Sequence, residues 1–181
     1  MIKPIIFPNK KVSAQDHGAL FAAALPDGIL SGCAITYTGA TLNIGTGRLV
    51  IAGREIQIIS TESVSVGLTS AVARVKAVID TAQVSTADTF GQFSWEVDYA
   101  ASVSALPALQ QTDINMDGTI YEMEICALNV GSGGITGIAR KASAIGFQRG
   151  KLILPYNNTD LIGTALPSAG TPGRIYLKKV T

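Results

Sequence analysis

Polar and apolar residues alternate in two segments of the chain, 73–80 (ARVKAVID), where Val78 is the exception, and 92–99 (QFSWEVDY). Such alternation is typical of a β-strand that buries one of its faces. If the two strands form an antiparallel hairpin with Arg74 opposite Asp98, then Lys76 lies opposite Glu96, and the apolar faces also match: Val75, Ala77 and Ile79 face Val97, Trp95 and Phe93. A shift by one residue would break both faces, so the pattern predicts this register. We expect these charges to be exposed, and therefore to contribute to register more than to stability.

Glycine interrupts the segment 31–59 (SGCAITYTGATLNIGTGRLVIAGREIQII) every few residues. Between the glycines lie four short runs of β-forming residues, 33–37, 41–44, 48–52 and 55–59. Because glycine adopts positive φ at little cost, Gly39, Gly45, Gly47 and Gly53 are predicted to be turn positions between antiparallel strands. No reactive group stands out in this segment, which has the character of a scaffold.

Two further strands are predicted at 119–129 and 135–142, joined by a glycine-rich turn at 131–134. Alternation in the first of them places four side chains toward the core and Glu122 and Glu124 outside; the four are Tyr121, Met123, Ile125 and Ala127. Residues 101–118 are predicted to form a loop or short helix, and the loop 81–91 is long and polar for a hairpin, so it could contact a ligand or partner.

One helix is predicted, from Ser13 to about Leu25. Ser13 is a favourable N-cap with Asp16 three residues later, and the sequence Pro-Asp-Gly at 26–28 ends the helix. Its apolar face comprises Leu20, Phe21, Ala24 and Leu25, and His17 falls on the same side.

These elements predict an all-β protein, an antiparallel β-sandwich or jelly-roll-like domain with one short N-terminal helix. We expect an N-terminal arm and helix at 1–28, the sandwich at 29–145 and a C-terminal extension at 146–181. The arm could contain a short strand at 3–8. The extension is punctuated by proline and glycine and ends in an alternating segment at 174–180.

The composition favours a subunit of a larger assembly. Hydrophobic residues make up 47% of the 181 residues and charged residues only 15%, so much of the surface must be neutral or apolar. The net charge of +1 includes no basic stripe for nucleic acid, and no apolar run is long enough for membrane insertion. The N-terminus lacks the apolar core of a signal peptide, so we expect synthesis in the cytoplasm with Cys33 and Cys126 as buried thiols, although a disulfide stays open.

Several segments together resemble a known family. They are 12–21 (VSAQDHGALF), 28–37 (GILSGCAITY) and 49–54 (LVIAGR), with similarity continuing to about Arg140 through 113–119 (DINMDGT) and 131–138 (GSGGITGI). This pattern resembles tail-fibre and baseplate structural proteins from phages and prophages of Gram-positive bacteria. The resemblance implies a virion component without enzymatic activity or cofactor, assembled in the bacterial cytoplasm. It also implies a homotrimer that attaches to other tail or baseplate proteins and supports host recognition, with or without touching a host surface glycan itself.

The sharpest chemical motif is Asp113-x-Asn115-x-Asp117-Gly118, with Glu124 at the twelfth position. This spacing matches a calcium-binding loop, in which oxygen ligands occupy positions 1, 3, 5 and 12. If 119–127 is a strand, however, Glu124 lies about 20 Å from the turn and cannot reach the ion. The candidates are therefore a partial calcium site at Asp113, Asn115 and Asp117, or an Asx turn leading into the strand. The second is favoured.

No catalytic residues are predicted. His17 is the only histidine, and its neighbour Asp16 points elsewhere on a helix, so we expect a packed or interface histidine. The acidic pairs 96/98 and 122/124 lie on what is expected to be a solvated strand face. Phe93, Trp95 and Tyr99 are predicted to be core residues. The alternative is that these rings form the glycan platform of a carbohydrate-binding β-sandwich.

Overall fold

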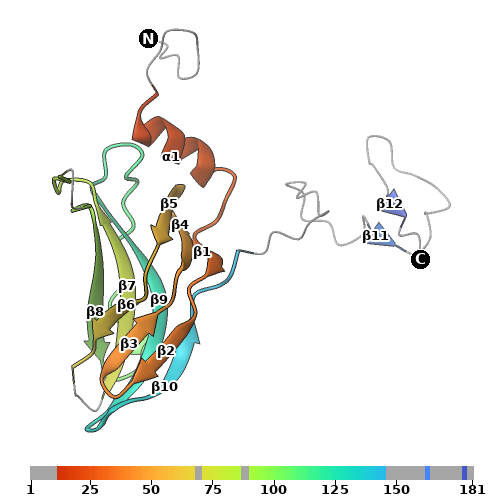
Figure 1. Ribbon diagram of the computed structural model, residues 1–181. Coiled ribbons are helices and arrows are strands. Elements are labelled where there is room, and N and C mark those ends of the chain that lie inside the picture. Colours follow the sequence, from red (N-terminus) through yellow and green to blue (C-terminus); the bar gives the residue numbers. More distant parts are fainter. Residues whose placement is uncertain (1–11, 68–70, 87–89, 146–161, 164–176, 179–181) are drawn as a thin grey trace. The chain divides into compact units, whose positions relative to one another are not determined.

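The computed structural model describes residues 12–67, 71–86, 90–145, 162–163 and 177–178 (Figure 1). The chain divides into two compact units, residues 1–146 and 147–181. In the second unit, β11 (Ile162–Gly163) pairs in parallel with β12 (Leu177–Lys178). The segment predicted as a strand at 174–180 is described only at these two β12 residues, and the predicted arm strand at 3–8 lies outside the described residues.

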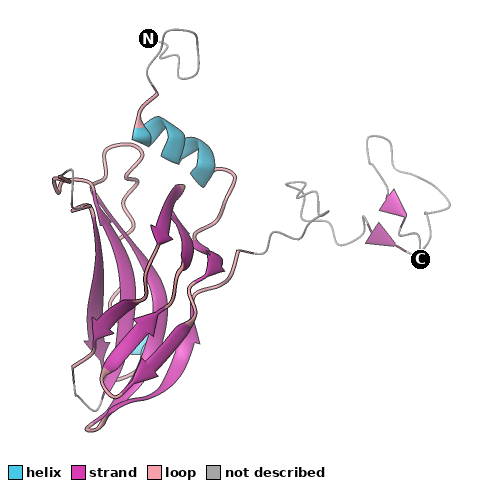
Figure 2. Ribbon diagram, in the orientation of Figure 1, coloured by secondary structure: helices cyan, strands magenta, loops and turns pink. Residues whose placement is uncertain are grey.

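Where the structure describes it, the first unit is all-β apart from one short helix and a single 3-10 turn, as the sequence predicted (Figure 2). Its strands form three sheets. One sheet has the order β1 (Gly28–Gly32), β4 (Gly47–Ile51), β5 (Arg54–Ile58). A second has the order β2 (Ile35–Thr38), β3 (Thr41–Ile44), β6 (Glu62–Ser65). The largest has the order β10 (Gly134–Lys141), β9 (Ile120–Gly131), β7 (Ala71–Asp80), β8 (Phe93–Ala100).

The two three-stranded sheets pack against one face of the four-stranded sheet and form a sandwich (Figure 1). Its single hydrophobic core takes side chains from all three sheets, among them Leu42 and Ile44 from β3, Leu49 from β4 and Val75 from β7. These four are fully buried. The opposite, outer face of the four-stranded sheet carries charged residues instead.

The predicted register of the β7–β8 hairpin is confirmed at every pair. Arg74 lies opposite Asp98 and Lys76 opposite Glu96, while Ala77 faces Trp95 on the inner side. Two complementary patterns, one on each face, were sufficient to fix the pairing.

A β-bulge in β9 corrects one predicted core residue. The pairing with β7 shifts between Val75, which pairs with Cys126, and Lys76, which pairs with Glu124. The extra residue, Ile125, reverses the alternation beyond it. Ala127 therefore pairs with Arg74 on the outer face, where it is fully buried but lies outside the main core cluster, whereas Cys126 belongs to that cluster.

The glycine-rich segment forms two hairpins in two different sheets. Gly39 and Gly53, at φ of 56° and 74°, are the turns of β2–β3 and β4–β5, as predicted. The prediction is wrong for Gly45 and Gly47, because β3 and β4 do not pair and the chain crosses there from one sheet to the other. β4 pairs instead with β1, and β3 with β6, two strands that the sequence pattern did not reveal.

The helix α1 (Ala14–Ala22) begins with the predicted capping box, since Ser13 Oγ accepts from Asp16 N and the Asp16 carboxylate accepts from Ser13 N. It ends three residues earlier than Leu25. The helix approaches the sandwich through Gly18, its only buried residue, which lies against the β4–β5 turn at Gly53. A Cβ at Gly53 would overlap the backbone of α1, so the close contact requires glycine at this positive φ.

Asp27, which lies in the connection from α1 to β1, forms hydrogen bonds with both the β4–β5 turn and β9. Its Oδ1 accepts a 2.7 Å hydrogen bond from the backbone N–H of Ala52, a turn residue at φ 48°. Its Oδ2 accepts a 2.7 Å hydrogen bond from the hydroxyl of Tyr121 in β9. Burial and the adjacent Asp27 raise the pKa of Tyr121 to about 12.

Candidate functional site

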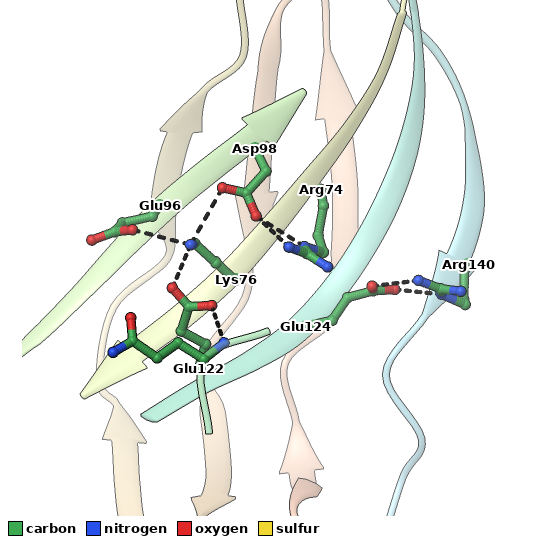
Figure 3. A network of polar contacts seen from close by, with 8 residues as sticks. Arg74, Lys76, Glu96, Asp98, Glu122, Glu124 and Arg140 are labelled. Atoms are coloured by element: carbon green, nitrogen blue, oxygen red, sulfur yellow. Dashed lines mark hydrogen bonds and ion pairs between the residues drawn. The ribbon is translucent and has the colours of Figure 1, made fainter. Parts of the chain in front are cut away.

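The outer face of the four-stranded sheet holds the main cluster of charged side chains, shown in Figure 3. Lys76 lies at its centre and bridges three carboxylates from two neighbouring strands. Its Nζ lies 2.5 Å from Glu122 Oε1, 3.3 Å from Glu96 Oε2 and 3.3 Å from Asp98 Oδ1. Arg74 donates from Nε and Nη2 to Asp98 Oδ2. The cluster therefore alternates positive and negative groups.

The expectation that these pairs are exposed is wrong. The side chains of Arg74 and Lys76 are only 5% and 8% exposed, and that of Glu122 10%. The reason is the central position of β7, which is flanked by acids from β8 and also from β9. The segment before β9 adds to the burial, because Gln110 N donates a 2.8 Å hydrogen bond to Glu122 Oε2.

The cluster stabilises the charged forms of Lys76 and Asp98. Burial acts to lower the pKa of Lys76, but hydrogen bonds to Glu122 and Asp98 outweigh it and the pKa is raised. Burial acts to raise the pKa of Asp98, but hydrogen bonds from Arg74 and Lys76 outweigh it and the pKa is lowered. Each group thus holds its charge more firmly than it would in water, which suits a structural ion pair better than proton transfer.

Glu124 belongs to a second, separate ion pair. It lies in the strand β9, as expected, and accepts two hydrogen bonds from Arg140 of β10, at 2.6 and 2.5 Å. This bidentate pair raises the pKa of Arg140. The carboxylate of Glu124 therefore pairs with Arg140 and does not join the turn that precedes β9.

The three candidate calcium ligands lie in that turn. The first two, Asp113 and Asn115, are joined there by a hydrogen bond from a backbone N–H to a carboxylate. Asp113 Oδ1 accepts a 3.0 Å hydrogen bond from Asn115 N, and Asp113 O accepts from Gly118 N at 2.9 Å, so the turn has the form of an Asx turn. Asp117 is exposed in the same turn. Among the described residues, no three histidine, cysteine or acidic side chains converge as metal ligands.

Asn115 also makes contacts that the sequence did not predict. Its Oδ1 accepts a 2.7 Å hydrogen bond from Arg54 Nη1, and its Nδ2 donates to Ala52 O at 3.1 Å. Arg54 also reaches Ile114 O at 3.2 Å. The turn is thereby attached to the β4–β5 hairpin, and a guanidinium occupies the oxygen that a calcium ion would use. The partial calcium site at Asp113, Asn115 and Asp117 stays a prediction.

The aromatic residues of β8 do not form a common platform. Phe93 and Trp95 are partly buried, pack against the core and contact each other edge to face, with ring centroids 4.9 Å apart. Tyr99 is 43% exposed, but its hydroxyl accepts a 2.6 Å hydrogen bond from Gly67 N. Phe93 and Trp95 therefore lie against the core, and the hydroxyl of Tyr99 is used within the protein.

The remaining candidate groups are not assembled into a catalytic arrangement. His17 is exposed on α1. Cys33 and Cys126 are buried free thiols. Burial raises the pKa of both, that of Cys126 to about 12, which suppresses the reactive thiolate.

A depression of about 390 Å³ opens on the outer face next to the Lys76 cluster. It lies between the long β7–β8 loop, represented by Gln83 and Gln92, and the segment containing Gln110. Sequence reasoning noted the length and polarity of this loop, but it missed the depression because that also needs Gln110, which the fold brings alongside.

No protein-family model matches the chain, and no curated protein matches its sequence. Among the described residues, the structure contains no helix of the length and apolar character that a membrane crossing would require.

Proposed function

We propose that this protein is a non-enzymatic structural subunit that assembles with copies of itself, as a trimer, in the tail fibre or baseplate of a phage or prophage of Gram-positive bacteria. In this role it would attach to other tail proteins within the virion and support host recognition. The resemblance of segments 12–21, 28–37 and 49–54 to that family supports the assignment. The all-β scaffold and its low charge are consistent with it.

One observation of the structure carries the assembly part of the proposal. The helix α1 contacts the sandwich through Gly18, so its larger apolar side chains face outward. Leu20 is 54% exposed and Phe21 49%. Met116, in the turn that touches α1, is 72% exposed. Apolar side chains gathered at one end of a domain are typical of a surface that another subunit covers.

The alternative, a carbohydrate-binding module that uses Phe93, Trp95 and Tyr99, has less support. A stacking platform needs ring faces turned to solvent. Here Phe93 and Trp95 pack against the core.

The test is the mass of the full chain in solution, measured by light scattering over about a hundredfold range of concentration. We expect oligomers that dissociate when Leu20 and Phe21 are both replaced by serine. The matched control replaces Ile59 and Val84, which lie outside α1 and are 81% and 83% exposed, and should leave the mass unchanged. A wild-type protein that is monomeric at every concentration would refute assembly through this surface. Detection of the chain in virions purified from the encoding strain tests its location.

A further inference from the structure

The depression beside Lys76 has the chemistry of a binding site for a positively charged group. Three carboxylates line it, those of Asp80, Glu96 and Glu122, and none of the described lining residues is basic. Val78 and Ile120 add apolar surface. The site therefore combines negative charge with a hydrocarbon surface.

Hydrogen bonds within the loop leave the lining rich in acceptors. Gln83 donates from Nε2 to Asp80 Oδ2 at 2.9 Å, and Gln92 donates from Nε2 to Thr81 O at 3.2 Å. Each of these amides thus donates one N–H within the protein, while its carbonyl oxygen can accept a hydrogen bond from a ligand. Asp80 is held in place by the same bond and by Ala82 N at 3.0 Å.

The structure already shows how this surface receives an ammonium group. Lys76 Nζ reaches Glu122 and Glu96 from one end of the depression, at 2.5 and 3.3 Å (Figure 3). Glu96 stays 51% exposed in this arrangement. Asp80 lies on the same strand as Lys76, four residues further along, and is held by neutral donors.

A metal ion fits this arrangement poorly. Among the described residues, no three acidic, histidine or cysteine side chains are placed to hold a metal ion. Carboxylates spread along a groove with apolar surface between them suit a longer cation, whose charged end and methylene stem can be bound separately.

We propose that this depression binds a primary ammonium group on an aliphatic stem, with Asp80 and Glu96 as its anionic partners and Val78 and Ile120 in contact with the stem. Either a free aliphatic diamine or a lysine side chain on a partner protein supplies this chemistry. The proposal concerns the outer face of the four-stranded sheet, and it does not depend on the proposed assembly.

The proposal can be tested by NMR on the ¹⁵N-labelled full chain. The first probe is 1,5-diaminopentane, with 1,5-pentanediol as the uncharged control of the same length. The second is the blocked tripeptide Gly-Lys-Gly, with its Nε-acetylated form as control. We expect both amines, and neither control, to shift the side-chain amide signals of Gln83, Gln92 and Gln110. Binding of the diamine alone would assign a free amine as the ligand, whereas equal binding of the peptide would assign a lysine side chain.

Charge-removing variants connect the shifts to the proposed partners. Asp80→Asn and Glu96→Gln should each raise the Kd of the diamine about threefold to fivefold, the range of a partly exposed ion pair. The matched control is Glu55→Gln, which removes a 48% exposed carboxylate elsewhere and should leave the Kd unchanged. The proposal is wrong if the depression signals do not move, if pentanediol moves them equally, or if Glu55→Gln weakens binding as much as the other two variants.

Discussion

The buried ion cluster on the outer face makes a quantitative prediction about stability. Lys76→Met keeps an unbranched stem of similar size but removes the ammonium that faces Glu122, Glu96 and Asp98. Glu122 is 10% exposed and would retain Gln110 N as a partner while losing its counter-charge. Breaking a buried pair from one side typically costs about 3–5 kcal/mol, because an uncompensated charge stays buried. We expect a loss of about 3 kcal/mol in the free energy of unfolding, the low end of that range, because Glu96 remains half-exposed.

The chain contains a matched control for this measurement. Arg48 and Glu55 form an ion pair of 2.7 Å, but both side chains are 48% exposed. An exposed pair contributes about 0–1 kcal/mol, so Arg48→Met should cost little. The contrast between the two variants isolates burial, because both pairs are short, hydrogen-bonded and on sheet surfaces.

Equilibrium unfolding in urea measures both variants, and Glu122→Gln with the double variant completes a cycle. We expect a coupling energy of about 1–2 kcal/mol between Lys76 and Glu122, within the range for residues in one ion-pair network. If Lys76→Met costs no more than Arg48→Met, or if the coupling is zero within error, then burial does not strengthen this cluster and the reasoning fails.

Three further predictions follow from other features. The pKa of Asp98 is lowered in the folded state, so its ionised form stabilises the fold above the unfolded pKa near 4, and this stabilisation is lost as the pH falls through the lower folded pKa. Asp98→Asn should therefore flatten the acid limb of a curve of unfolding free energy against pH, and an unchanged limb would contradict this. Gly53→Ala should destabilise the protein by about 1–3 kcal/mol in urea unfolding because a Cβ there is strained and overlaps α1, while Gly133→Ala, with open space around it, should be nearly neutral. Since Arg54 occupies Asn115 Oδ1, we expect millimolar calcium to leave the melting temperature unchanged; a rise that disappears in Asp113→Ala would instead establish the calcium site.

Much of the fold was predictable where the sequence holds two independent patterns. The β7–β8 register followed from matching apolar and charged faces, and the start of α1 from its capping box. The missed strands, β1 (GILSG) and β6 (ESVS), are short and carry little alternation. Their extended form goes with tertiary pairing, since β1 pairs with β4 and β6 with β3.

The candidate sites were harder to predict because their parts are distant in the sequence. Glu122 buries Lys76 only because β9 lies beside β7, and a hairpin pattern cannot reveal a third strand. Arg54 and Asn115 are 61 residues apart, and no local signal joins them. The β9 bulge likewise depends on pairing with β7, so simple alternation placed Ala127 on the wrong face.

The strand β8 is an edge strand of its sheet, and its sequence disfavours pairing with the β8 of a second copy. A rim strand of eight residues offers unpaired peptide groups to any strand that approaches it. In β8, however, two acids alternate with the inward-facing side chains, and an antiparallel second β8 would bring Glu96 and Asp98 near their own kind. This repulsion disfavours pairing of two copies through β8, so any self-association would have to use other parts of the surface.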